Sequence, residues 1–239
     1  MAYSRIIVKI SGEALSGSGG ECYNSAVLKD ISGQLSDILS SGVQVGLVIG
    51  AGNIWRGRMD ADMNRSVADN MGMLATLVNA LCMADCINRS GASAKVLSAV
   101  SIDSVADRFT RDKAEEAFQK NCAVIFAFGT GNPFFTTDTA AALRACEVEA
   151  DAVFYAKNID GVYDSDPKNN SNARKFKTIS YSDIIAKDIK FIDQTAAILL
   201  RDNDIDSVAF YLNEQNGIRN AVLNGTYGTL IRKDIETAF

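Results

Sequence analysis

Short apolar runs recur along most of the chain. They are continuous rather than alternating with polar residues, which is the pattern of strands buried on both faces of a sheet. On this basis we predict strands at Arg5–Ile10, Val43–Ile49, Lys95–Ala99, Ala123–Phe128, Ala152–Ala156 and Ser207–Leu212.

The segments between these runs carry apolar residues three and four positions apart, as helices packed on a sheet do. They predict helices at Ser25–Ser40, Val67–Arg89, Arg111–Gln119, Thr137–Cys146, Gln194–Asp202 and Gly217–Asn224. Alternation of strands and helices predicts an α/β fold with a mostly parallel sheet. The polar segment Asp164–Lys177 predicts an exposed loop. We therefore expect an N-terminal lobe of residues 1–156 and a shorter C-terminal lobe of residues 157–239, in one continuous fold.

One of the predicted helices carries apolar residues at alternating spacings of four and three. This rhythm is typical of a seam where helices associate, and equally of the buried face of a core helix. The periodicity leaves both interpretations open. The positions are Val67, Met71, Leu74, Val78 and Leu81.

Composition restricts the partners and the location. The 239 residues carry a net charge of −5, and an acidic chain without a basic stripe is unlike a general nucleic-acid binder. Arg5 and Lys9 interrupt the apolar run near the N-terminus, which therefore predicts neither a signal peptide nor a membrane anchor. No apolar run reaches the length of about 18 residues that spans a bilayer. We expect a soluble, cytoplasmic protein.

The chain contains no histidine. This excludes Ser-His-Asp and Cys-His catalysis and removes the commonest general base. The absence of histidine also disfavours a zinc site, and the five cysteines form no CxxC pair. We therefore expect no metal site built from protein side chains. Any chemistry must use lysine, arginine, aspartate, backbone amides or a metal ion.

Glycine-rich turns follow three of the predicted strands. Ser11-Gly12-Glu13 comes directly after Lys9-Ile10, Gly50-Ala51-Gly52-Asn53 is followed by Arg56, and Gly129-Thr130-Gly131-Asn132 follows the fourth strand. Ligands bind beyond the carboxyl ends of strands in open α/β sheets. Glycines there let backbone amides approach phosphates. The turns predict phosphate binding, although the P-loop, dinucleotide and protein-kinase fingerprints are all absent.

Asp138 begins the helix predicted after the third glycine-rich turn. Its carboxylate suits an N-cap of that helix, and it also suits a group that orients a lysine or a metal-bound phosphate. Asp193 precedes another predicted helix and has the same two interpretations. The sequence pattern alone leaves both aspartates open.

Five motifs together resemble the bacterial uridylate kinase (UMP kinase) family of the amino acid kinase superfamily. In order along the chain they are KISGEAL at Lys9–Leu15, GAGNIWRG at Gly50–Gly57, DNMGMLAT at Asp69–Thr76, TGNPFFTTDTAAALRA at Thr130–Ala145 and NIDGVYDSDP at Asn158–Pro167. The resemblance spans nearly the whole chain. It implies a three-layer α/β/α sandwich of the amino acid kinase type. It also implies the reaction ATP + UMP → ADP + UDP in pyrimidine nucleotide biosynthesis, with Mg²⁺ bound through the ATP phosphates.

The resemblance also implies a site for each nucleotide. It places the ATP phosphates near Lys9, Ile10, Ser11, Gly12, Gly52 and Arg56, and the adenosine near Lys157, Asn158, Tyr163 and Asp166. It places UMP near Ala51, Asp69, Thr130, Gly131, Asn132, Pro133, Phe134, Phe135, Thr136 and Thr137, with Asp69 on the ribose.

Lys9, Arg56 and Asp138 are the catalytic residues that this resemblance suggests. The acceptor phosphate has a second pKa of about 6 and is largely dianionic at neutral pH, so no general base is needed. The protein must instead align two charged phosphates and neutralise their charge. In this interpretation Asp138 holds Lys9 in place rather than removing a proton.

The resemblance further implies a homohexamer built from dimers, activation by GTP and inhibition by UTP. Three stretches depart from the family pattern. Ala51 stands in GAGN where GGGN is usual, Tyr155-Ala156-Lys157 stands where Lys-Ala-Thr is common, and Gly19–Tyr23 differs from the stretch often linked to GTP activation. For that reason we do not carry GTP activation over to this chain.

Two other functions fit parts of the pattern. A related kinase could phosphorylate a small carboxylate or carbamate, but the aromatic and hydroxyl residues of Asn132–Thr137 suit a nucleobase better. A non-catalytic nucleotide-binding or oxoanion-storage oligomer could keep the glycine turns, but it would have no need for both Lys9 and Asp138. Catalysis on a nucleotide is the favoured interpretation.

Overall fold

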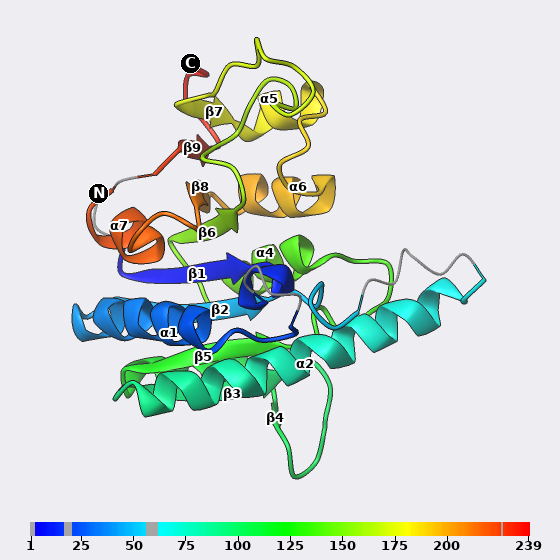
Figure 1. Ribbon diagram of the computed structural model, residues 1–239, viewed down its shortest axis with the longest axis vertical. Coiled ribbons are helices and arrows are strands. Elements are labelled where there is room, and N and C mark those ends of the chain that lie inside the picture. Colours follow the sequence, from blue (N-terminus) through cyan, green and yellow to red (C-terminus); the bar gives the residue numbers. More distant parts are fainter. Residues whose placement is uncertain (1–2, 17–20, 56–61, 226) are drawn as a thin grey trace.

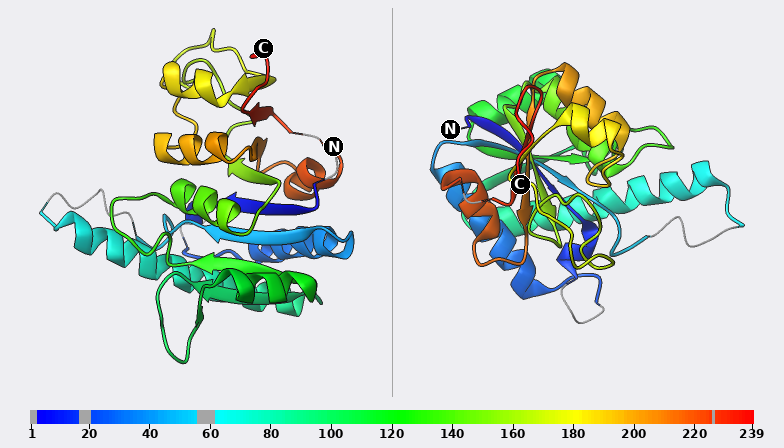
Figure 2. Two further views of the ribbon diagram at one scale, coloured as in Figure 1. Left: turned by 180° about the vertical axis from the view of Figure 1, so that it is seen from behind. Right: turned by 90° about the horizontal axis from the view of Figure 1, so that it is seen from above.

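Helices cover both faces of a single twisted sheet (Figures 1 and 2). The computed structural model describes residues 3–16, 21–55, 62–225 and 227–239. Within these residues, nine strands form the sheet in the order β4-β3-β5-β2-β1-β6-β8-β9-β7. All neighbouring strands are parallel except β8 and β9. The predicted three-layer α/β architecture is confirmed.

The six predicted strands are all present, with ends shifted by at most two residues. They are β1 (Arg5–Ile10), β2 (Gln44–Ile49), β3 (Ser93–Ser98), β5 (Cys122–Ala127), β6 (Ala152–Lys157) and β8 (Asp206–Tyr211). Three short strands were not predicted, because two to four residues are too few to show a period. They are β4 (Asp107–Arg108), β7 (Thr178–Ser180) and β9 (Thr229–Arg232).

Two hydrophobic cores lie between the sheet and its helices, one on each face of the sheet. On one face lie α1 (Ser25–Ser40), α2 (Arg65–Arg89) and α7 (Gly217–Leu223). On the other lie α3 (Arg111–Gln119), α4 (Thr137–Glu147), α5 (Tyr181–Ala186) and α6 (Gln194–Asp202). The six predicted helices are confirmed, whereas the short α5 and the 3₁₀ helix at Gly12–Leu15 were not predicted. Side chains such as Ile7, Val8 and Phe154 are fully buried, and each contributes about 1.5–3 kcal/mol through burial.

The apolar residues spaced four and three positions apart on α2 do not form its buried face. Val67, Leu74 and Val78 are about half exposed, at 51%, 50% and 49%. The interpretation as a core face is therefore wrong, because the helix packs on the sheet through another face that includes Ala80 and Met83. By length and composition, α2 is the one described helix that could cross a membrane. Half of the relevant window is buried inside the protein, as in a core helix.

The sheet continues across the expected boundary between the lobes. β6 ends at Lys157 and pairs with β1 on one side and β8 on the other. Asp164–Lys177 contains no named strand or helix and is mostly exposed, as predicted. The division at residues 156 and 157 stays a prediction about binding roles.

Candidate active site

Four adjacent parallel strands end at the same edge of the sheet. In the order β5-β2-β1-β6 they lie at its centre, and the carboxyl ends of such strands commonly form ligand sites. β1 delivers Lys9, β2 leads into the turn at Gly50, β5 leads toward α4, and β6 delivers Lys157. The three glycine-rich turns and two lysines thus come together at one edge.

The first two glycine-rich turns touch each other at Gly12. A Cβ atom on Gly12 would lie 2.4 Å from Oδ1 of Asn53, 2.6 Å from the carbonyl oxygen of Gly50 and 2.7 Å from the amide nitrogen of Gly52. The amide of Gly50 donates a hydrogen bond to the carbonyl of Ile10 at 2.9 Å. Only a residue without a side chain fits at position 12 in this arrangement.

A buried amide on α2 holds the second turn. Asn79 is fully buried, and its Nδ2 donates to the carbonyl of Gly50 at 2.7 Å and to Oδ1 of Asn53 at 2.8 Å. Its Oδ1 accepts a hydrogen bond from Tyr23 Oη at 2.8 Å. We did not select Asn79 from the sequence. A lone asparagine between apolar positions of a helix was the available signal, since a buried amide needs partners.

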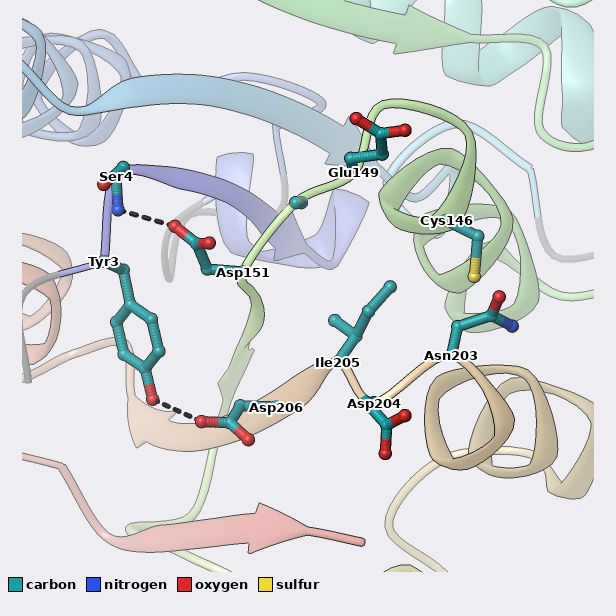
Figure 3. Close-up of a pocket in the computed structure, with 10 residues that line it drawn as sticks. Tyr3, Ser4, Cys146, Glu149, Asp151, Asn203, Asp204, Ile205 and Asp206 are labelled. Atoms are coloured by element: carbon teal, nitrogen blue, oxygen red, sulfur yellow. Dashed lines mark hydrogen bonds between the residues drawn. The ribbon is translucent and has the colours of Figure 1, made fainter.

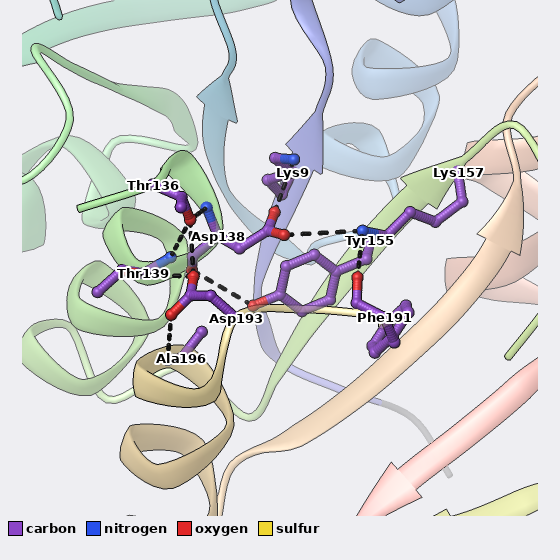
Figure 4. A network of polar contacts seen from close by, with 9 residues as sticks. All are labelled: Lys9, Thr136, Asp138, Thr139, Tyr155, Lys157, Phe191, Asp193 and Ala196. Carbon is purple, nitrogen blue, oxygen red and sulfur yellow. Dashed lines mark hydrogen bonds and ion pairs between the residues drawn. The ribbon is translucent and has the colours of Figure 1, made fainter. Parts of the chain in front are cut away.

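Asp138 lies between two lysines (Figure 4). Its Oδ1 is 2.6 Å from Nζ of Lys9, and its Oδ2 is 3.7 Å from Nζ of Lys157. Burial raises the pKa of Asp138, but the charges of the two lysines outweigh burial and hold the pKa below its ordinary value. The contact expected between Asp138 and Lys9 is therefore present, with a charged carboxylate.

Asp138 is not the N-cap of α4, so that alternative is wrong. The N-cap is Thr136, whose hydroxyl oxygen accepts hydrogen bonds from the amides of Asp138 and Thr139. This leaves the Asp138 side chain in the first helical turn, free to reach the lysines. Asp193 is the N-cap of α6 and accepts from the amide of Ala196 at 2.9 Å.

Asp193 also ties α6 to the start of α4. Its Oδ2 accepts hydrogen bonds from the hydroxyl groups of Thr136 at 2.6 Å and Thr139 at 2.8 Å. Thr136 in turn caps the helix that carries Asp138. Asp193 thus supports the helical turn that carries Asp138, which the order of residues in the sequence could not show.

Replacing Asp193 with asparagine is expected to lower kcat by about tenfold while leaving the KM for UMP within about threefold. Asparagine can still cap α6, but the change removes the charge of the carboxylate that accepts from Thr136 and Thr139. Hydrogen bonds to a charged group are worth about 1.5–3 kcal/mol, and a rise of about 1.4 kcal/mol in the barrier lowers the rate about tenfold. Steady-state kinetics on the purified variant measure it. The matched control is Asp112→Asn, which alters an exposed carboxylate in the first turn of α3. Equal kcat values for Asp193→Asn and the wild type would contradict a positioning role.

A cavity of about 550 Å³ opens beside the third turn. Eight of the ten residues expected at UMP line it: Ala51, Asp69, Thr130, Asn132, Phe134, Phe135, Thr136 and Thr137. Gly131 and Pro133 belong to the same loop but are not among its lining residues. Sequence reasoning missed Arg65, Met73 and Thr76, which contribute to the wall from α2. Trp55 also lines the cavity and donates Nε1–H to the carbonyl of Ala68 at 2.9 Å.

Asp69 fixes the shape of the aromatic loop in this cavity. Its Oδ2 accepts a hydrogen bond from the amide of Phe134 at 2.8 Å. Phe134 has a φ of +75°, and the guanidinium of Arg65 lies 5.1 Å from its ring centroid. Both Phe134 and Phe135 are at least half exposed, so their rings are accessible for stacking on a base. Ala51 does not adopt a positive φ, so its methyl group is tolerated in the turn.

A second cavity of about 410 Å³ lies on the other side of β1, after β6. Lys157, Tyr163 and Asp166 line it, as expected for an adenosine site. Asn158 is exposed and does not line it. Ile189 and Phe191 add apolar wall from the segment before α6. Sequence reasoning missed both, because this segment is distant along the chain and has no motif of its own.

A larger cavity, of about 670 Å³, lies at the opposite edge of the sheet (Figure 3). Its carboxylates already have partners in the protein. Asp151 accepts from the amides of Ser4 and Arg5, and Asp206 accepts from Tyr3 Oη at 3.0 Å. None of the expected site residues lines it. We therefore place the functional site at the carboxyl edge of the strands.

Two expectations fall outside the described residues. Arg56, expected at the ATP phosphates, is one of them. The other is the pair Gly19-Gly20, which begins the stretch Gly19–Tyr23 that departs from the pattern linked to GTP activation. The remaining expected site residues lie at the carboxyl edge or on the loops that follow it.

Comparison with known proteins defines the class of protein. The model of the amino acid kinase family matches residues 4–210, and the chain belongs to that family. UMP kinase from Bacillus anthracis is 33% identical over the full length of both chains, with a TM-score of 0.95. UMP kinase from Ureaplasma parvum is 36% identical, with 98% of this chain and 100% of that chain covered and a TM-score of 0.92.

A more distant structure shares the same architecture. Uridylate kinase from Archaeoglobus fulgidus is 25% identical over 95% of this chain and 99% of its own, with a TM-score of 0.72. Within the family, the chain therefore groups with the UMP kinases, which are phosphotransferases. The family resemblance inferred from the five motifs is confirmed.

Proposed function

We propose that this protein transfers the γ-phosphoryl group of ATP to UMP and releases ADP and UDP. The observation that carries the proposal is the Lys9–Asp138 ion pair on β1 and α4. β1 lies between β2 and β6 in the sheet. The pair is therefore flanked by the cavity suited to UMP and the cavity suited to ATP.

The transfer exchanges one P–O bond for another. An oxygen of the UMP phosphate forms a bond to the γ-phosphorus as the bond to the β–γ bridging oxygen breaks. The electron pair of the broken bond leaves with the β-phosphate of ADP. Because UMP is already largely dianionic, no proton needs to be removed, and the residues have only to align and neutralise the phosphates.

Lys9 is the group that we assign to charge neutralisation. Its side chain is 10% exposed and lies at the end of β1, where Ser11 and Gly12 turn their backbone toward the same edge. Asp138 holds its ammonium group by charge. The Lys9 ammonium group has three donors. It can therefore pair with Asp138 Oδ1 at 2.6 Å and also face a bound phosphate. Arg56 is proposed to assist.

Mg²⁺ belongs to the same proposal as a partner of ATP. Within the described part of the chain, no three histidine, cysteine, aspartate or glutamate side chains converge on one point. The cation would therefore be held by the β- and γ-phosphates, whose charge it shields during transfer. The backbone of the glycine-rich turns would contact the phosphates that the cation leaves free.

The test is an assay of ADP formation with ATP, Mg²⁺ and one acceptor at a time. UMP, CMP, dUMP, AMP, GMP, N-acetylglutamate and aspartate are compared, and GTP and UTP are then added to the best reaction. We expect UMP to be preferred strongly. Turnover only with an amino acid would move the protein to another branch of the family. Tight nucleotide binding without turnover on any acceptor would favour a storage or sensing protein.

We also propose that α2 forms the contact between subunits of a homohexamer built from dimers. The supporting observation is its exposed apolar stripe, which a long seam between two copies would cover. A cytoplasmic location and a role in pyrimidine nucleotide supply complete the proposal, because the reaction consumes free ATP and UMP.

Replacing Leu74 with glutamate is expected to dissociate the oligomer into smaller species. Leu74 is 50% exposed in one chain, so the charge costs little in the isolated fold but is unfavourable once a second helix covers it. Light scattering after size-exclusion chromatography measures the mass. Val105→Glu changes a similarly exposed apolar residue away from α2, at 48% exposure, and is the matched control. An unchanged mass for Leu74→Glu would contradict an interface on this stripe.

A further inference from the structure

One side of the second cavity is formed by a loop that doubles back on itself. Gly161–Asp166, the wall, lines the cavity. Arg174–Phe176, the backing strip, pairs with the wall in the antiparallel direction. The amide of Asp164 donates to the carbonyl of Arg174 at 3.1 Å, and the amide of Arg174 donates to Oδ1 of Asp164 at 2.9 Å. The shape of the wall therefore depends on the position of the backing strip.

The ring of Phe239 contacts both ends of the backing strip. Its centroid lies 4.5 Å from that of Phe176, with the two ring planes 25° apart. The guanidinium carbon of Arg174 lies 3.7 Å from the Phe239 centroid, within the range of a cation–π contact. The amide of Phe176 donates to the carbonyl of Val162 in the wall at 2.8 Å. Phe239 thus touches two residues that hydrogen-bond to the wall.

The segment Glu236–Phe239 is held beside β7 (Figure 1). The amide of Ala238 donates to the carbonyl of Thr178 at 2.9 Å, and the hydroxyl of Thr237 donates to the carboxylate of Asp183. Because β7 is the last strand in the order of the sheet, this backbone covers a strand edge. The ring of Phe239 takes no part in that pairing and reaches the backing strip instead.

The two ends of the wall are held differently. At the first end, the buried hydroxyl of Thr229 accepts from the amide of Val162 at 2.9 Å and donates to the carbonyl of Phe176 at 2.5 Å. At the other end, Asp164–Asp166 is exposed, and exposed backbone hydrogen bonds open readily. Arg174 binds this exposed end, and Phe239 stacks on Arg174. The ring therefore supports the end of the wall that water can open.

We propose that Phe239 is a positioning residue that holds the wall in the shape that binds the adenosine of ATP. This inference rests on the proposed function, which places the adenosine in the second cavity. A wall that is formed for part of the time binds its ligand more weakly, in proportion to the fraction of time that it is formed. Phe239 therefore acts on the binding of ATP and leaves the binding of UMP and the transfer step unchanged.

Kinetics of Phe239→Ala test this division. We expect the KM for ATP to rise about tenfold, or about 1.4 kcal/mol, with kcat and the KM for UMP within about twofold of the wild type. Phe239→Tyr keeps an aromatic ring that can stack and should restore the KM for ATP. Ile198→Ala removes an apolar side chain of α6 that is 40% exposed, and as the matched control it should change neither KM. An unchanged KM for ATP, or an equal rise in both KM values, would overturn the proposal.

Hydrogen exchange in the ligand-free protein measures the wall itself. In Phe239→Ala the amides of Asp164 and Arg174 should exchange about tenfold faster, since the same opening of the wall governs exchange and binding. The amides of β1 should exchange as in the wild type. Equal exchange at Asp164 in the variant and the wild type would show that Phe239 does not hold the wall, and would overturn the proposal.

Calorimetry separates failure of this proposal from failure of the proposed function. ATP and AMP are titrated into the wild type and into Phe239→Ala, and we expect both to bind about tenfold more weakly to the variant, because both carry the adenosine. A wild type that binds neither nucleotide would overturn the proposed function and the nucleotide role of Phe239 with it, while exchange would still report on the wall. Tight binding to the wild type and equally tight binding to the variant would overturn only the present proposal, leaving the ring as a cover of the sheet edge.

Discussion

Replacing Lys9 with methionine is expected to lower kcat by about 10³-fold or more, the range reported for cationic groups that stabilise phosphoryl transfer. Methionine is a flexible apolar residue of similar length, so it can fill much of the same space. The variant therefore removes the charge while largely preserving the packing. Coupled-assay kinetics with saturating ATP and UMP measure the effect.

The same variant should change the dependence of stability on pH. In the wild type the pKa of Asp138 is below its ordinary value because two lysine charges outweigh the effect of burial. Its contribution to stability is therefore complete above the unfolded-state pKa of about 4 and is lost as the pH falls through the lower folded-state pKa. Removing Lys9 leaves burial with one opposing cation, so the pKa of Asp138 rises. Acid unfolding should then begin at a higher pH.

Denaturant titrations followed by circular dichroism, at several pH values on the acid side of neutrality, measure this shift. Lys29→Met is the control, because Lys29 is exposed and has no part in the site. Asp138→Asn should likewise lose most of its turnover, since Lys9 is then no longer held in place. Near-normal kcat for both Lys9→Met and Asp138→Asn would show that the assigned roles are wrong.

The fold was largely predictable because its central strands are long and buried. β1, β2 and β5 each have five consecutive buried residues, and such runs are visible in a sequence. The strands that were missed lie toward the edges of the sheet and are stabilised by their neighbours. β9, for example, is placed by its antiparallel pairing with β8, which involves residues more than 15 positions apart. Pairing of this kind leaves no local pattern.

The site was predictable where its residues lie in motifs and unpredictable where geometry brings distant segments together. Glycine-rich turns after strands indicated the edge of the sheet where the structure brings Lys9, Asp138 and Lys157 together. The support from Asn79 and Asp193 was missed or underweighted, because their partners lie 29 and 57 positions away in the chain. The two interpretations of Asp138 could be separated only when Thr136 was seen to cap α4. A cap and a catalytic carboxylate can be neighbours, and a sequence does not show which is which.

The spacing of apolar residues on α2 shows a different limit of sequence analysis. Periodicity identifies an apolar face but not what covers it. Here the stripe containing Leu74 and Val78 is exposed in the single chain, while residues such as Ala80 and Met83 pack on the sheet. A helix with two apolar faces is expected where one face binds the core and the other binds another copy.

Replacing Gly12 with alanine is expected to lower kcat/KM for ATP by about 100-fold, equivalent to about 2.7 kcal/mol. The new methyl group would collide with backbone atoms of Gly50 and Gly52, at 2.6 and 2.7 Å, as well as with Asn53. Backbone contacts this short force the two phosphate-facing turns apart, and overpacking of this kind typically costs about 1–3 kcal/mol of stability.

Gly33→Ala is the matched control for the change at Gly12. It makes the same substitution inside α1, where an added Cβ would meet nothing within 4 Å. Alanine in a helix interior is more stable than glycine by about 0.5–1 kcal/mol, so Gly33→Ala should raise the free energy of unfolding and leave turnover unchanged. If the contact at Gly12 is as described, denaturant titration should show a lower free energy of unfolding for Gly12→Ala and a higher one for Gly33→Ala. Kinetics should show a loss of kcat/KM only for Gly12→Ala. Full activity in Gly12→Ala would mean that the first two turns need not touch for phosphate transfer.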